Sequence, residues 1–500
     1  MKVIDYKRGK QKVTTFFYVC LAVLICLILT DAAHAENQDA DLAPTCTESG
    51  YRTVEEQGVI RLEEIPPLGH QFGDWIIAED GKSKTHTCSA CGYEETIRIG
   101  PVPEEKLPWL NLKGEMEGIG KKNRVVLEAE FVSEEDAFQC YGIMTIQGHS
   151  TYGFPKKNYT IRFYDDPEGK DKHKISFSDW DREHKFILKA NYEDLSQCRN
   201  LVGAEIWEEM TESRSNVPEQ IQNLPHYGVV DGFPVAVYLN GSFFGLYTLN
   251  LHKDDDLYQM KNGRQEAILI CNAQTTDEAL FRAPAAFAED YSSDWEVEFC
   301  GTEDDSWAKE SFNQLITFVM ESSDEEFAAH LDKYLDVDAA VDYLLFIYAL
   351  GLEKSGAKDL VLLNYGDRWI PTAFDMDEAF GLDPANARYR QPEEFLPVLS
   401  EGRIESGTGS LLWDRLLTHY QDRIIARYRE LRENTLSGEN MIKHVKEFIA
   451  QIPESFYDYD TYLYPDRPVK DNQMDVQIEH YITERTQVLD RVFGVGGESK

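Results

Sequence analysis

Two aspartates two residues apart, Asp375 and Asp377, are the residues whose types and spacing most directly indicate chemistry. An apolar run ends just before them, and Phe380 and Gly381 follow. If residues 372–376 are extended, both carboxylates point to the same side of a strand. Neighbouring carboxylates repel one another unless a hard cation lies between them, so the pair predicts a Mg²⁺ or Ca²⁺ site. The alternative is a solvated strand end followed by a turn.

A glycine-containing loop followed by two lysines is the second stretch suited to chemistry. It lies at 148–155, between strands expected over 140–147 and 157–164. Backbone N–H groups of such a loop can approach phosphate oxygens, and a lysine just beyond it can neutralise their charge. Lys157 is favoured because it opens the second strand; the alternative is a hairpin tip with solvated lysines. The predicted phosphate-binding residues are Gly148, Ser150, Lys156, Lys157 and Lys189.

The length and charge of the chain limit what the protein can do. Its 500 residues suffice for two or three domains with a large core. The formal net charge is -39, and the first 35 residues are basic, so the remainder is more acidic still. Such a surface repels nucleic-acid phosphates and anionic lipid head groups, so neither is expected as a partner.

Residues 1–35 have the pattern of an export signal. A basic stretch ends at Lys12, the apolar run Phe16–Leu29 follows, and Ala-His-Ala at 33–35 precedes a predicted cleavage point before Glu36. An uncleaved membrane anchor is the alternative, but the apolar run is short for a membrane span. We therefore expect a secreted or cell-surface protein with no stable membrane span after cleavage.

Residues 36–105 differ from the rest of the chain. Their motifs are Cys46-Thr-Glu-Ser-Gly-Tyr, Ile65-Pro-Pro-Leu-Gly-His and Thr87-Cys-Ser-Ala-Cys-Gly. They resemble a short cysteine-containing repeat of surface proteins from Gram-positive bacteria, and we expect a small β-rich spacer module. Cys88 and Cys91, with His86 nearby, could hold Zn²⁺, but a zinc site needs four ligands and the first repeat lacks its own cysteine pair. A single disulfide and an unmetallated stalk are equally open.

The pattern of the remaining chain changes from strand-like to helix-like. Alternating apolar residues over 123–132 predict a strand, and Asn240-Gly241 between two apolar runs predicts a hairpin. From residue 306 on, helical spacing predominates apart from a strand pair over 360–364 and 369–374. The helices expected near the end of the chain cover 409–435, 439–451 and 474–493. We assign residues 106–385 to a core and 386–500 to its helical continuation.

Four stretches carry a pattern that is specific in combination. They are Gln147–Phe163 with Pro-Lys-Lys-Asn-Tyr, Leu188–Asn200 with Ala-Asn-Tyr-Glu-Asp and Arg-Asn, Val237–Thr248 with Tyr-Leu-Asn-Gly, and Asp375–Gly381 with Asp-Met-Asp and Phe-Gly. In this order they resemble the signatures of the spore coat protein H (CotH) kinase family. The resemblance implies an α+β, atypical two-lobed protein-kinase-like fold, with a β-rich N-lobe and a helical C-lobe.

The resemblance also implies ATP and Mg²⁺ or Mn²⁺ as cofactors, with Asp375 holding the metal and Asp359 and Asp377 assisting. Relatives carry an Asp that orients the acceptor hydroxyl, a few residues before a metal-binding Asn. Here Glu353 or Lys354 stands at the first position, with a one-residue insertion, and Asp359 stands at the second. Glu353 and Asp359 are therefore the predicted catalytic residues, whereas Lys354 in the first position would leave no proton acceptor.

Three functions remain open on the sequence. The first is a secreted protein kinase that transfers the γ-phosphoryl group of ATP to Ser or Thr of an exported or coat protein. The second is a catalytically inactive surface or coat scaffold of the same fold, which the altered catalytic loop favours. The third is a carbohydrate-binding wall protein, which the 26 Tyr and 8 Trp allow although they are spread through apparent core patterns.

Overall fold

The computed structural model describes residues 42–495, except 57–58, 78–82, 99–105, 149, 178–179, 288–292, 401–402, 406–407 and 470–473. The predicted export signal lies outside the described residues. The chain divides into two compact units, residues 1–100 and 101–500. Among the described residues, no helix has both the length and the apolar character needed to cross a membrane.

The first unit consists of short antiparallel strands with almost no apolar interior. β1 (Gly50–Glu56) pairs with β2 (Val59–Ile65). A three-stranded sheet contains β3 (Ile76–Ile77), β4 (Ser83–Thr87) and β5 (Glu94–Arg98). Among the described residues of this unit, the buried apolar side chains are those of Cys46 and Cys88. A hydrophobic core of this size is too small to hold the unit together.

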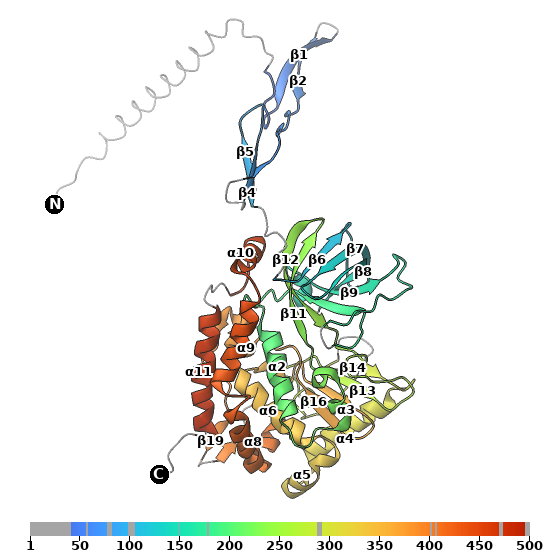
Figure 1. The fold of residues 1–500 in the computed structure, drawn as a ribbon, viewed down its shortest axis with the longest axis vertical. Coiled ribbons are helices and arrows are strands. Elements are labelled where there is room, and N and C mark those ends of the chain that lie inside the picture. Colours follow the sequence, from blue (N-terminus) through green and yellow to red (C-terminus); the bar gives the residue numbers. More distant parts are fainter. Residues whose placement is uncertain are drawn as a thin grey trace, which may run out of the picture. The chain divides into compact units, whose positions relative to one another are not determined.

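A closed seven-stranded barrel begins the second unit (Figure 1). Its strands are β6 (Trp109–Lys113), β7 (Val125–Val132), β8 (Ala137–Gln147), β9 (Asn158–Tyr164), β10 (Lys185–Lys189), β11 (Gly232–Leu239) and β12 (Ser242–Leu251). The order around the barrel is β10-β12-β11-β6-β7-β8-β9. Neighbouring strands are antiparallel except β6 and β11, which are parallel. Closure leaves no unpaired strand edge.

The local sequence explains two parts of the barrel. In β7, Leu127, Ala129 and Phe131 are buried and alternate with more exposed residues, as the period-two pattern predicts. Asn240 and Gly241 both have positive φ, at 52° and 79°, which a two-residue hairpin turn requires. The predicted hairpin between β11 and β12 is confirmed.

A four-stranded antiparallel sheet separates two hydrophobic cores. Its strands, in spatial order, are β14 (Trp295–Cys300), β13 (Ala267–Cys271), β15 (Val361–Asn364) and β16 (Trp369–Thr372). In β13, Ile268 and Ile270 pack with the residues that fill the barrel, whereas Leu269 packs with the helices. Because both faces are covered, every residue of β13 and β15 is buried.

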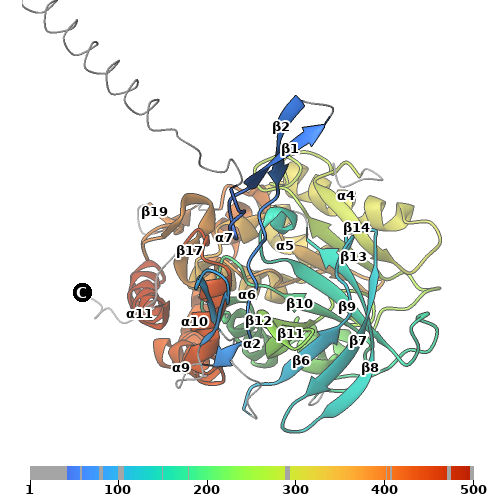
Figure 2. The same cartoon turned by 90° about the horizontal axis from the view of Figure 1, so that it is seen from above.

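Helices make up most of the remainder; α10 lies beside the barrel, and most of the others lie away from it (Figure 1). They are α2 (Arg199–Glu212), α3 (Glu219–Gln222), α4 (Ser306–Glu321), α5 (Asp324–His330), α6 (Val337–Leu350), α7 (Leu411–His419), α8 (Gln421–Glu433), α9 (Gly438–Ala450), α10 (Glu454–Leu463) and α11 (Met474–Val492). α9 and α11 lie side by side, as Figure 2 also shows. The α+β class predicted from the sequence is confirmed.

The helical part differs from the prediction in two places. Residues 409–435 form two helices, α7 and α8, because Tyr420 between them has a non-helical backbone, with φ -117° and ψ 20°. α10 was not predicted; its tyrosine-rich sequence packs against β12 of the barrel. Short two- and three-residue strands complete the unit: β17 (Leu382–Asp383), β18 (Arg388–Tyr389), β19 (Val398–Ser400) and β20 (Arg403–Glu405).

Candidate active site

The Asp-x-Asp pair lies in a turn after β16 and not on a strand. β16 ends at Thr372, and Asp375 has a left-handed backbone, with φ 53°. The condition for both aspartates to point to one side of an extended strand is therefore not met. They nevertheless converge on one group, because Lys354 Nζ lies 2.7 Å from Asp377 Oδ1 and 3.9 Å from Asp375 Oδ2.

Lys354 is surrounded by four carboxylates. Besides Asp375 and Asp377, Asp359 Oδ2 and Glu378 Oε1 each lie 3.6 Å from its Nζ. The lysine is buried and is the first residue of a short 3₁₀ turn, Lys354–Gly356. Gly351, which ends α6 with a left-handed backbone, directs the chain into this turn. The carboxylates therefore meet around an ammonium group supplied by the chain itself.

Glu353, the predicted catalytic base, lies outside this cluster. Its side chain is 53% exposed, and its contact is with Arg390, at 3.4 Å. Of the two residues that the alignment with the family left open, the structure brings Lys354 and not Glu353 to the carboxylates. Asp359, the other predicted catalytic residue, lies in the cluster directly before β15, where its N–H donates to the Cys271 carbonyl at 2.8 Å.

Of the three candidate phosphate-binding lysines, Lys189 is the one that meets the aspartates. It is the last residue of β10, and its Nζ donates to Asp375 Oδ1 at 2.6 Å. Lys156 is fully buried and paired with Asp460, at 2.8 Å, so its predicted role in phosphate binding does not agree with its position. Lys157 donates to the carbonyl of Tyr152 at 2.6 Å.

The glycine-containing loop leaves the barrel beside Lys189. Gly148 has φ 102°, which favours glycine, and Ser150 begins a short 3₁₀ turn. The loop ends at Asn158, whose side-chain Oδ1 accepts a hydrogen bond from the N–H of Ala190 at 2.7 Å. Because Ala190 follows Lys189, the predicted phosphate loop and the lysine occupy the same end of the barrel.

The Ala-Asn-Tyr-Glu-Asp…Arg-Asn stretch holds the turn that carries the aspartates. Arg199 is buried and donates to the carbonyls of Ala379 and Phe380. Asp194 fixes this arginine, with its Oδ1 3.1 Å from the Arg199 Nε and its Oδ2 accepting the Arg199 backbone N–H at 3.0 Å. A Cβ on Gly203 would lie 3.0 Å from the Cβ of Met376, so α2 lies very close to the aspartate turn.

A family model described as CotH kinase protein matches residues 144–489 of the chain. The chain belongs to the CotH kinase family. The matched segment begins in β8 and ends in α11, and it contains every residue of the cluster around Lys354. No curated protein matches the chain.

The charges of this CotH-family cluster shift one another's protonation. Burial opposes the charge on Asp375, but Lys189 and Lys354 outweigh it and hold the pKa of this carboxyl well below its usual range. Burial likewise opposes the charge on Lys354, yet Asp377 and Asp375 raise its pKa well above the usual value. The pKa of Asp359 rises to about 7, because it is buried and faces Asp375. The site therefore holds two firmly charged lysines against several carboxylates.

Three residues of the site were missed in the sequence. Burial, together with Asp377, raises the pKa of Glu193 to about 7. Glu378 contacts Lys354 and also Arg390, the latter at 2.8 Å. Glu193 and Glu378 both lie inside the stretches that resemble the family, so the motifs themselves were an available signal. Arg390 lies outside all four motifs.

In protein kinases a helix glutamate pairs with the phosphate-binding lysine, whereas Glu205 on α2 pairs with a histidine. Its Oε2 lies 2.9 Å from His444 Nδ1, on α9. Lys189, at the end of β10, pairs with Asp375 and not with Glu205. The analogy with the kinase helix ion pair therefore does not extend to this residue.

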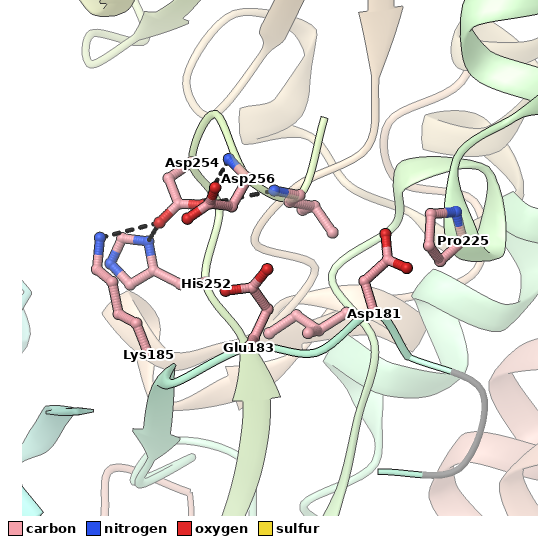
Figure 3. A pocket seen from close by; sticks show the side chains of 9 residues that line it. Asp181, Glu183, Lys185, Pro225, His252, Asp254 and Asp256 are labelled. Atoms are coloured by element: carbon pink, nitrogen blue, oxygen red, sulfur yellow. Dashed lines mark hydrogen bonds and ion pairs between the residues drawn. The ribbon is translucent and has the colours of Figure 1, made fainter. Parts of the chain in front are cut away.

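Figure 3 shows a different pocket, at the other end of β10, and four of its nine lining residues are acidic. Lys185, which opens that strand, lies 2.9 Å from Asp254, and His252 lies 3.1 Å from the same carboxylate. Lys185 and Lys189 are separated by about 13 Å along an extended strand. This pocket is therefore not part of the cluster around Lys354.

Proposed function

We propose that this CotH-family chain is an ATP-dependent protein kinase that phosphorylates Ser or Thr of an exported or coat protein. In this proposal the barrel is the N-lobe of a two-lobed kinase-like fold, and the helices with the four-stranded sheet are the C-lobe. The observation that carries it is the 2.6 Å pair between Lys189, at the barrel end, and Asp375, after β16. Phosphoryl transfer requires such a phosphate-binding cation beside a metal-binding carboxylate.

The donor set suits a divalent cation and a triphosphate. Asp359, Asp375 and Asp377 offer hard oxygen ligands, which Mg²⁺ prefers. Asp359 Oδ2 is buried and accepts no hydrogen bond among the described residues, so it has capacity for a cation. A bound metal would neutralise charge on the phosphates. In this structure the carboxylates form ion pairs with Lys189 and Lys354. When a triphosphate and a metal bind, the phosphate oxygens can replace the carboxylates as partners of these two ammonium groups.

Each residue then has a defined task. Lys189 and Lys354 hold phosphate oxygens through their ammonium groups, while Asp375 holds the cation with Asp359 and Asp377. The loop that begins at Gly148 turns backbone N–H groups toward the phosphates. Two carboxylates are available to accept or orient the hydroxyl of the substrate: Glu353, which is half-exposed beside Arg390, and Glu193, whose pKa of about 7 suits a general base near neutral pH.

A second candidate function, an inactive surface or coat scaffold, is favoured by Lys354. Its Nζ lies within 4 Å of Asp359, Asp375 and Asp377, the carboxylates that a metal would need. A cluster that is already neutralised by its own lysine is stable without metal. The scaffold would keep the family fold and bind no nucleotide.

We also propose that the chain is exported through the signal over residues 1–35 and acts outside the cytoplasm. The basic stretch, the apolar run and the Ala-His-Ala site support this. Residues 36–105 would then be a spacer of the surface-protein repeat type. Detection of a mature chain beginning at Glu36 in the medium or at the cell surface would test this part.

The decisive experiment incubates the full chain with γ-labelled ATP, Mn²⁺ or Mg²⁺ and a generic acidic protein. We expect label on the chain or on the added protein, and a loss of about 100-fold or more in Asp375→Asn. Asp367→Asn is the matched control, because Asp367 is exposed in the turn between β15 and β16. No label, combined with no thermal shift by metal and ATP, would overturn the kinase and establish the scaffold.

A further inference from the structure

Four potential metal ligands converge in the first unit, from three separate segments of the chain. They are Cys46, His70, Cys88 and Cys91, and their ligand atoms all lie within 4.8 Å of one another. We propose that these four residues bind one Zn²⁺ ion, and that this ion holds the described part of the first unit in its fold. The proposal is independent of the kinase activity, since all four ligands lie outside the segment matched by the family.

The distances between ligand atoms suit a tetrahedral ion. Cys46 Sγ and Cys88 Sγ are 3.8 Å apart, and Cys91 Sγ is 3.3 Å from His70 Nδ1. Two thiolates bound at 2.3 Å to a tetrahedral Zn²⁺ lie about 3.8 Å from each other, and a thiolate and an imidazole nitrogen about 3.5 Å. Three cysteines and one histidine are an established ligand set for structural zinc.

The backbone brings the segments together before any metal is considered. The N–H groups of Leu68 and Gly69 donate to the carbonyls of Thr45 and Cys46 at 2.9 and 3.1 Å, which places His70 beside Cys46. The N–H of Gln71 donates to Cys88 Sγ at 3.2 Å. Such an N–H to sulfur bond stabilises a thiolate, which is the form that binds zinc.

The Cys88-x-x-Cys91 pair forms a tight turn. The N–H of Gly92 donates to the Cys88 carbonyl at 2.9 Å, and Gly92 has φ 75°, a conformation that glycine tolerates. The turn leaves Cys88 buried and Cys91 exposed. One ligand therefore faces solvent, which gives an ion a path into the site.

His86, the histidine first considered as a ligand, has another role. Its ring stacks on Phe72 at 3.9 Å and on Trp75 at 3.5 Å, and its Nε2 lies 2.7 Å from Glu95. His70 takes the position that the sequence assigned to His86. The sequence offered a signal, because His70 ends the Ile-Pro-Pro-Leu-Gly-His motif, but only the fold shows that it faces the cysteines.

The need for a metal follows from the composition of this unit. Its buried apolar side chains among the described residues are two cysteines, and both are proposed ligands. Strand residues such as Leu62 and Ile76 are exposed, at 62% and 72%. Small units without a sufficient core require disulfides or metals for stability. A disulfide between Cys46 and Cys88 would leave Cys91 and His70 without a function, whereas zinc uses all four.

The test measures metal in the full chain purified under reducing conditions. We expect one zinc per chain by native mass spectrometry, lost in Cys46→Ser and in His70→Ala. Cys300→Ser and His86→Asn are the matched controls, because Cys300 lies in the second unit and His86 contacts aromatic rings; both should retain zinc. Substitution with Co²⁺ should give the visible absorption of a tetrahedral site with three thiolates.

A swap of ligand type separates loss of a ligand from loss of folding. His70→Cys offers four thiolates, so it should retain one metal and change the Co²⁺ spectrum. Zinc that persists in Cys46→Ser and His70→Ala would overturn the proposal. So would a parent chain that contains no zinc after purification under reducing conditions.

Discussion

Each of the two units of the chain contains a cluster of potential metal ligands. The two clusters differ in whether a side chain of the protein already occupies the centre. In the second unit, four carboxylates surround Lys354, whose Nζ is 2.7 Å from the nearest of them. In the first unit, three cysteines and a histidine face one another with their ligand atoms within 4.8 Å. Carboxylates can be neutralised by a side-chain ammonium, whereas thiolates and imidazole form their strong bonds with a metal.

The difference teaches that a cluster of ligands must be interpreted together with the cations of the same chain. The first cluster is the main source of order in a unit without a core, so its metal would be structural. The second cluster is already balanced by lysines inside a large hydrophobic fold, so a metal there would serve binding and chemistry. Removal of metal should therefore affect the two units very differently.

Chelation of zinc in the full chain has the largest expected effect. A structural zinc site contributes about 10 kcal/mol or more to the folding of a small domain. Amide exchange in β4 and β5 should rise by orders of magnitude, whereas exchange in β9 and β10 should stay constant. Added Zn²⁺ should restore protection. Unchanged exchange in β4 and β5 after verified removal of metal would contradict the contrast between the units.

Removal of a lysine with a purely structural role should have the next largest effect. Lys156→Met removes one of the two cations that face the buried Asp460, the other being Arg467, so we expect a loss of about 2 kcal/mol in the free energy of unfolding, measured with urea. Lys157→Met is the adjacent control and should change stability by less than about 0.5 kcal/mol. Equal effects of the two substitutions would show that Lys156 is not held as the structure has it.

Lys354→Met should make the second cluster resemble an open metal site. Loss of the central ammonium leaves several carboxylates in mutual repulsion, so stability should fall by about 2 kcal/mol without metal. Mg²⁺ or Mn²⁺ should then raise the melting temperature of the variant more than that of the parent chain. Lys358→Met is the control, since among the described residues Lys358 forms no ion pair within 4 Å of these carboxylates. No additional metal response in the variant would refute the role given to Lys354.

Deprotonation of His444 should have the smallest effect on the free energy of unfolding. His444 lies 2.9 Å from both Glu205 and Glu209, and these hydrogen bonds raise its pKa from 6.5 to about 9. The native state thus binds a proton more tightly than the unfolded state. The resulting stability, about 1 kcal/mol because the two glutamates are partly exposed, should be present below pH 6.5 and lost as the pH rises through 9. His444→Gln should remove this part of the pH dependence of unfolding.

Local patterns in the sequence were sufficient to predict several elements of the fold. The alternation in β7 and the Asn240-Gly241 turn are local effects, and both are confirmed. The parallel pairing of β6 with β11 was not predictable, because more than a hundred residues separate the two strands and no local pattern specifies the register. α10 was missed because aromatic residues fit helices and strands alike.

The prediction of the candidate site was incomplete for the same reason, because contacts between distant residues leave no local pattern. The sequence predicted Asp375 and Asp377 from the Asp-x-Asp motif, and Asp359 from its position where relatives of the family carry a metal-binding Asn. It could not decide between Glu353 and Lys354, because a shift of one residue after a left-handed Gly351 changes which side chain turns inward. The position of Lys156 depends on Asp460, which is 304 residues away. Such pairs depend on tertiary packing alone.

The pairing of Lys156 with Asp460 also constrains the order in which the chain can fold. As the polypeptide emerges from the ribosome, the barrel strands are complete once residue 251 has appeared, but the carboxylate that neutralises Lys156 belongs to α10. An intermediate of the first 400 residues would have to bury an uncompensated charge or leave the barrel partly open. Such high contact order slows folding. A nascent chain should therefore keep its barrel partly open until it is almost fully synthesised.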